Sequence, residues 1–107
     1  MGGAERPDDI NLVGEWVGHY TGHYDETIRI VAVDGFYEAW KVTGDDFVPA
    51  GELTWRVNQN TLQGIGQVAE QGFRNPRMVP GGLEILDADH IRFHWKNHAQ
   101  VEFRRDD

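Results

Sequence analysis

Apolar and polar residues alternate along almost the whole chain, and this period of two constrains its fold more than any other feature. Such alternation is typical of β-strands with one buried face, and no window sustains the 3.6-residue period of a helix. Eight strands are predicted. They cover residues 13–20, 26–33, 36–43, 51–57, 61–70, 77–86, 90–96 and 99–104.

Short turns join most of these segments. Asp34-Gly35, between two alternating segments, is a strong signal for a two-residue hairpin. Eight short strands joined in this way suggest an antiparallel barrel or a sandwich, and a barrel leaves no exposed edge. The predicted fold is therefore all-β: a single antiparallel, eight-stranded, up-and-down barrel, lipocalin-like in architecture. A barrel of this size is filled by side chains or holds one small ligand.

A chain of 107 residues makes one domain. We expect a disordered leader over residues 1–11, the barrel over 12–104 and a frayed tail over 105–107. The first nine residues lack the basic start and apolar stretch of a signal peptide, and no apolar run reaches transmembrane length. These features predict a cytoplasmic protein.

The composition excludes several classes of function. A net charge of −8 repels phosphate, so neither nucleic acid nor an anionic membrane is an expected partner. The chain has no cysteine and no serine, which removes the common acyl-transfer nucleophiles and thiolate zinc sites. His90, His94 and His98 alternate with Arg92 and Lys96 on a face that looks solvated. No metal or other cofactor is expected.

Glu38 shares its predicted strand face with Phe36, Trp40 and Val42. If this face points into the barrel, the carboxylate is buried and must be paired, hydrogen-bonded or protonated. Glu38 is then an anchor for the N–H groups of a ligand. The alternative is that Glu38 pairs with an arginine or lysine that reaches into the barrel, or that the strand is flipped so that Glu38 is solvated.

Two further groups are candidate binding residues. Trp16, Trp40, Trp55 and Trp95 are assigned to the interior, where they line a pocket or form ordinary core. Glu70, Arg74, Asn75 and Arg77 cluster at one bend of the chain. The arginines offer forked donors that match a carboxylate or carboxamide group, or one of them pairs with Glu70.

Several blocks of sequence carry a resemblance to a known domain. They are Tyr-Glu-Ala-Trp-Lys-Val-Thr-Gly-Asp at 37–45, Val-Pro-Ala-Gly at 48–51, Gly-x-Gly-x-Val-Ala-Glu at 64–70, and Gly-Phe-Arg-Asn-Pro-Arg at 72–77 with Pro-Gly-Gly-Leu at 80–83. Together with 14–20, they resemble the β-barrel domain shared by F-box only protein 31 and the chloroplast Executer proteins. The resemblance runs from about residue 12 to 104, although neither an F-box nor a transit peptide is visible.

This resemblance implies recognition of a substrate rather than catalysis, because the F-box member reads the C-terminal tails of proteins marked for ubiquitination. We therefore expect a binding module that takes a short peptide or protein C-terminal tail at a barrel mouth formed by residues 44–51 and 71–77. Glu38, the tryptophans and Arg74 or Arg77 are the predicted contacts. One alternative is a lipocalin-like carrier of a small hydrophobic molecule, and another is a small enzyme that uses a buried Glu38 as an acid or base.

Overall fold

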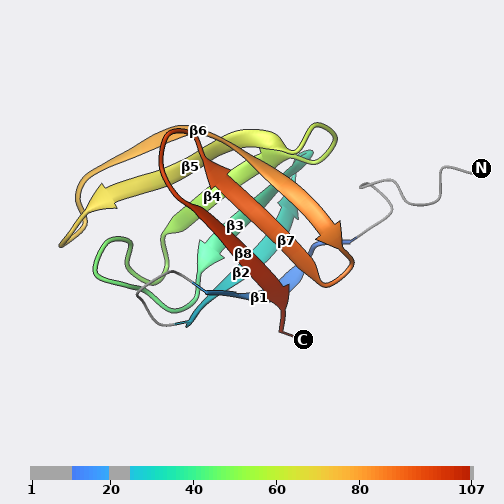
Figure 1. Cartoon of the computed structure of the whole chain (residues 1–107), viewed down its shortest axis with the longest axis horizontal. Helices are drawn as coiled ribbons and strands as arrows, with labels where there is room; N and C mark the ends of the chain where they lie inside the picture. Colours follow the sequence, from blue (N-terminus) through green and yellow to red (C-terminus); the bar gives the residue numbers. More distant parts are fainter. Residues whose placement is uncertain (1–10, 20–24, 107) are drawn as a thin grey trace, which may run out of the picture.

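The computed structural model describes residues 11–19 and 25–106, which form a closed antiparallel β-barrel (Figure 1). Each strand pairs with the next one in sequence, and β1 also pairs with β8 from Trp16↔Arg105 to Gly18↔Phe103. The predicted all-β, eight-stranded barrel is confirmed. Its strands are β1 (Gly14–His19), β2 (Asp25–Val33), β3 (Phe36–Lys41), β4 (Leu53–Asn58), β5 (Gln63–Glu70), β6 (Arg74–Asp87), β7 (His90–Trp95) and β8 (Gln100–Arg105).

The strand boundaries lie close to those predicted. The largest shift is in β6, which begins at Arg74 rather than at residue 77. Arg105, expected in a frayed tail, belongs to β8, and its guanidinium donates to the carbonyl oxygens of Asn11 and Ala88. The predicted leader lies outside the described residues except for Asn11. Within the described part of the chain, no helix is long and apolar enough to cross a membrane.

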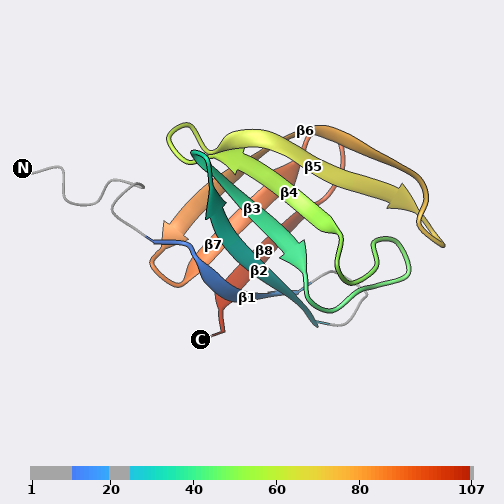
Figure 2. The ribbon, with the colours of Figure 1, turned by 180° about the vertical axis from the view of Figure 1, so that it is seen from behind.

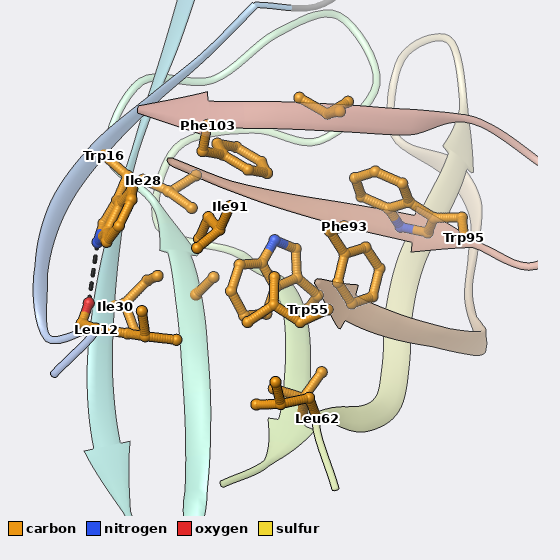
Figure 3. Packing of buried hydrophobic residues seen from close by; sticks show 14 residues of the cluster. Leu12, Trp16, Ile28, Ile30, Trp55, Leu62, Ile91, Phe93, Trp95 and Phe103 are labelled. Atoms are coloured by element: carbon orange, nitrogen blue, oxygen red, sulfur yellow. Dashed lines mark hydrogen bonds between the residues drawn. The ribbon is translucent and has the colours of Figure 1, made fainter. Parts of the chain in front are cut away.

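Aromatic side chains fill the centre of the barrel (Figure 3). The indole of Trp55 stacks on the ring of Phe93 with centroids 5.0 Å apart, and Phe93 meets Trp95 edge-on at 4.7 Å. Trp16 closes one side of the core, where its Nε1 donates to the carbonyl oxygen of Leu12 at 2.9 Å. Burial of such large apolar side chains is the main source of stability in a chain without disulfides.

The inward face of β3 is the opposite of the one predicted. Ala39 and Lys41 are buried, whereas Glu38 and Trp40 point outward, and 38% of Trp40 is exposed. The reason is the space needed by Trp55, which pairs directly with Ala39 across the sheet. A small residue opposite a large one is how narrow barrels fill their interior. The assignment of Glu38 and Trp40 to the barrel interior is therefore wrong.

The β5–β6 hairpin projects beyond the body of the barrel (Figures 1 and 2). The β4–β5 ladder ends at Trp55↔Gly66, but the β5–β6 ladder continues to Glu70↔Arg74. On its other side, β6 pairs with β7 only from Gly81 onward. The hairpin beyond these points is a two-stranded ribbon.

Two prolines occupy the outer edge of this ribbon. The Lys96 amide donates to the Pro80 carbonyl oxygen, so the backbone of Pro80 faces away from β5. Because strand residues alternate in direction, Met78 faces the same way, while the register shift next to Arg77 interrupts this alternation before Pro76. Proline has no N–H, so neither Pro76 nor Pro80 offers an amide donor on the outer strand.

Candidate functional site

A pocket of about 310 Å³ opens at the end of the barrel where β3, β5 and β7 end. Its wall combines apolar side chains with a few polar groups, the composition usual for ligand pockets. We call it the mouth pocket. It is lined by Lys41, Asp45, Phe47, Val48, Thr54, Gln67, Val68, Ala69, Trp95, His98, Ala99 and Val101.

A buried ion-pair cluster forms the polar side of the mouth pocket. The Lys41 ammonium lies 3.5 Å from Glu26 Oε1 and 3.3 Å from Asp45 Oδ2, and the side chains of Lys41 and Glu26 are each 2% exposed. The Thr43 hydroxyl also donates to Glu26 Oε1 at 3.1 Å. Each buried charge therefore has a partner, as burial requires.

The two carboxyl groups of this cluster are shifted in opposite directions. Burial raises the pKa of Glu26 above its ordinary value, and the Lys41 charge and the Thr43 hydroxyl only partly oppose this effect. Burial also acts to raise the pKa of Asp45, but the amide of Val48, the charge of Lys41 and the amide of Phe47 together hold it below its ordinary value. Asp45 is therefore the firmly ionised partner of Lys41.

Asp45 also shapes the β3–β4 loop. Its Oδ1 accepts from the amides of Phe47 and Val48 at 2.8 and 2.7 Å, which is the side-chain-to-backbone pattern that aspartate favours in turns. These bonds hold Phe47 and Val48 against the mouth pocket. Asp45 therefore links the ion-pair cluster to the apolar wall of the mouth pocket.

Trp95 and Gln67 form the opposite wall. The indole of Trp95 donates to the Gln67 carbonyl oxygen at 3.1 Å, and the Gln67 side-chain amide donates to the carbonyl oxygen of Leu53. Gly66 leaves room for the indole, because a Cβ there would lie 2.5 Å from Trp95 Nε1. These side chains bridge the gap where the β4–β5 ladder has ended.

Of the nine candidate residues, Trp95 alone lines the mouth pocket. Trp16 and Trp55 are fully buried core, and Trp40 lies on the outer surface. Glu38 is also on the outer face, as the flipped-strand alternative expected, and its carboxylate lies 3.4 Å from the guanidinium of Arg56. Glu70 pairs with Arg74 in the ladder at the base of the hairpin turn.

Arg74 and Arg77 bond to their own hairpin. Arg74 Nε donates to the Gln71 carbonyl oxygen at 3.0 Å and Arg77 Nη1 donates to the Asn75 carbonyl oxygen at 3.2 Å. All of Glu70, Arg74, Asn75 and Arg77 are exposed. Of the two loops expected to form the barrel mouth, residues 44–51 contribute Asp45, Phe47 and Val48 to the mouth pocket, and residues 71–77 contribute none of its lining.

Sequence reasoning missed Lys41, Glu26 and Asp45 as a cluster. A signal was available in the alternation of β3, because Lys41 shares a face with Ala39 rather than with Trp40. A larger depression of about 720 Å³ lies over β5, β6 and β7 and includes Gln63, Pro80 and His94, but it contains no predicted site residue. In residues 11–19 and 25–106, no three His, Asp or Glu side chains are arranged to hold a metal ion.

Comparisons with known proteins give two results. Residues 59–105 match the model of the Cyclin D1 binding domain family. The chain is also 31% identical over 98 residues to Protein EXECUTER 1, chloroplastic, of Arabidopsis thaliana, and 33% identical over 85 residues to Protein EXECUTER 2, chloroplastic, of Oryza sativa subsp. japonica. These alignments cover 74% and 62% of this chain but 14% and 13% of the relatives.

The relatives contradict one prediction. They are chloroplastic proteins by name, so the expectation of a cytoplasmic protein is not supported. The Executer part of the resemblance seen in the sequence is confirmed. Over the part that aligns, the chain is similar to Executer proteins, and its β5–β8 half is similar to Cyclin D1 binding domains.

Proposed function

We propose that this chain is a non-catalytic protein-binding module that takes a short peptide or the C-terminal tail of a partner protein in the mouth pocket. The observation that carries the proposal is the position of this pocket. It lies at the open end of a barrel whose centre is filled, and β5, β7 and β8 form much of its wall. These strands lie within the segment that matches Cyclin D1 binding domains.

The chemistry of the mouth pocket fits the end of a chain. A volume of about 310 Å³ is at the small end for ligand sites. Phe47, Val48 and Trp95 offer apolar contacts to one or two side chains, while Gln67 and His98 are polar residues of the wall that can contact a terminal group. The resemblance to F-box only protein 31 supports recognition of a C-terminal tail. Arg74 and Arg77 are proposed as further contacts to the peptide at the rim of the mouth pocket.

Titration with peptides tests the proposal. Labelled short peptides that end in a carboxylate or a carboxamide are added, and fluorescence anisotropy and tryptophan emission are followed. Saturable binding is expected for one class of terminus. Ala99→Phe, which fills the pocket, should weaken it at least tenfold, whereas Ala32→Phe, on an exposed position of β2, should not. Arg74→Ala and Arg77→Ala measure the contribution of the rim. Equal binding by the two phenylalanine variants would contradict the proposal.

The small-molecule carrier is the competing function, and the filled centre of the barrel argues against it. Trp55 and Phe93 occupy the space in which an enclosed ligand would lie. Native mass spectrometry distinguishes the two functions, because a carrier would retain an organic molecule through purification. An enzyme based on a buried Glu38 is not proposed, because Glu38 is on the outer face and pairs with Arg56.

A further inference from the structure

The mouth pocket has a length of unpaired β-strand backbone along one wall. The β4–β5 ladder ends at Trp55↔Gly66, and Ala69 has a partner in neither the β4–β5 nor the β5–β6 register. Gln67 and Ala69 both line the mouth pocket. The wall of the pocket is therefore also a strand edge.

The direction of this backbone follows from bonds nearby. The amide of Leu83 donates to the Leu62 carbonyl oxygen and that of Lys96 to the Pro80 carbonyl oxygen, which fixes the alternation along β6. Arg77 and Val79 then face β5, and their partners Val68 and Gly66 face β6. Gln67 and Ala69, at the alternate positions, present their N–H and C=O groups on the side from which β4 has departed.

Side chains satisfy only part of this edge. Trp95 donates to the Gln67 carbonyl oxygen, and the side chain of Gln67 donates to the Leu53 carbonyl oxygen on β4. Beyond Ala69 the hairpin reaches the β3–β4 loop, where the amide of Gly72 donates to the Asp46 carbonyl oxygen at 2.7 Å. Ala69 thus lies beside an opening bounded by β5 and the β3–β4 loop.

We propose that an extended peptide segment of a partner protein binds as an added β-strand in this opening, pairing its backbone with Ala69 of β5. Alternating N–H and C=O groups along an edge are complementary to another extended backbone, which is the basis of recognition by strand addition. This inference rests on the proposed function and adds the mode of binding.

The charge around the opening defines the peptide further. Asp46, Glu52 and Glu70 lie on the loop and the hairpin that border it, and the chain as a whole carries −8. Lys41 is already paired with Glu26 and Asp45. The added strand is therefore a segment with neutral or basic side chains, because acidic ones would be repelled.

The probe for the test is a mixed-sequence hexapeptide pool, prepared as free acids and as carboxamides. A second pool carries N-methyl groups on alternate backbone amides, and further pools contain a fixed lysine or a fixed glutamate. Retention on the protein is measured by mass spectrometry. We expect N-methylation to reduce retention about tenfold for peptides methylated on the paired face, and lysine-containing peptides to be retained better than glutamate-containing ones.

Ala69→Pro removes the edge N–H without removing a β5–β6 pair, because Ala69 has none. It should weaken retention about tenfold, whereas Ala69→Ser, which keeps the amide, should not. Hydrogen exchange gives a second measurement. The Ala69 amide should be slowed by a saturating peptide pool, while the Val68 amide, directed at β6, should not respond.

The possible outcomes separate the two proposals. If peptides bind but are insensitive to N-methylation, and Ala69 exchange is unchanged, strand addition is overturned and the peptide-binding function stands. If no peptide is retained in any pool, both are overturned. A dimer of this chain that protects Ala69 in the absence of peptide would replace the partner peptide with a second copy and would also overturn the inference.

Discussion

Replacing Lys41 with methionine removes the positive charge that lies between Glu26 and Asp45. At 3.5 and 3.3 Å, and with an effective dielectric constant of about 20, each contact is worth roughly 5 kcal/mol of Coulomb energy before the cost of desolvation. Removing one partner of a buried pair has a net cost of about 3–5 kcal/mol. Since Asp45 is partly exposed, we expect Lys41→Met to lower the free energy of unfolding by about 3 kcal/mol at neutral pH.

The penalty should depend on pH with a definite sign. Lys41 lowers the pKa of Glu26, so its removal moves this already raised pKa still higher. An acid whose folded-state pKa is raised destabilises the fold above its unfolded-state pKa, and this loss is relieved as the pH falls through the folded-state pKa toward the unfolded-state one. The penalty should therefore shrink as the pH falls from neutral toward the ordinary glutamate pKa of 4.5, at up to about 1.4 kcal/mol per pH unit.

Urea unfolding followed by tryptophan fluorescence measures this effect at fixed ionic strength. Lys96→Met is the matched control, because Lys96 is exposed and has no salt bridge among the described residues. The double variant Glu26→Gln/Lys41→Met should recover part of the loss, since one uncompensated carboxylate is gone. A penalty equal to that of Lys96→Met, or one that does not change with pH, would refute the reasoning.

Two other predictions concern the core and the loop. Trp55→Ala should cost about 3–5 kcal/mol of stability in urea unfolding, whereas Trp40→Ala should cost about 1 kcal/mol or less, and equal losses would contradict the observed face of β3. Because the pKa of Asp45 is below its ordinary value of 3.8, its ionised form stabilises the fold above that pH, and this contribution is lost as the pH falls through the lower folded-state value. Asp45→Asn should remove that component from acid unfolding monitored by fluorescence, so a constant stability difference between the two proteins across the acid range would contradict it.

Alternation alone predicted the fold, because a period of two and short turns leave few arrangements other than an antiparallel barrel. It failed for β3, where the more apolar set of residues, with Trp40, lies outside. The deciding quantity was the space opposite Trp55, which depends on which residue of β3 pairs with it. Register between strands is not contained in the pattern of either strand by itself.

The candidate site was less predictable for the same reason. Glu26 and Lys41 are fifteen positions apart and meet because β2 and β3 pair with one particular register, in which Ile28 lies opposite Lys41. Arg74 and Arg77 were predicted as binding residues because they are close together in sequence. Their hairpin carries them out beyond the body of the barrel, where their guanidinium groups bond to nearby carbonyl oxygens.

Pro76 and Pro80 have a consequence for solubility. A projecting two-stranded ribbon is a template on which other chains can stack into aggregates, and an edge with few N–H donors is a poorer template. In this ribbon the prolines lie on the outer strand, and the inner strand faces the pocket. The molecule can thus leave one backbone edge open while its solvent-facing edge resists self-association. Substituting both prolines should turn the hairpin into a nucleus for aggregation without altering the barrel.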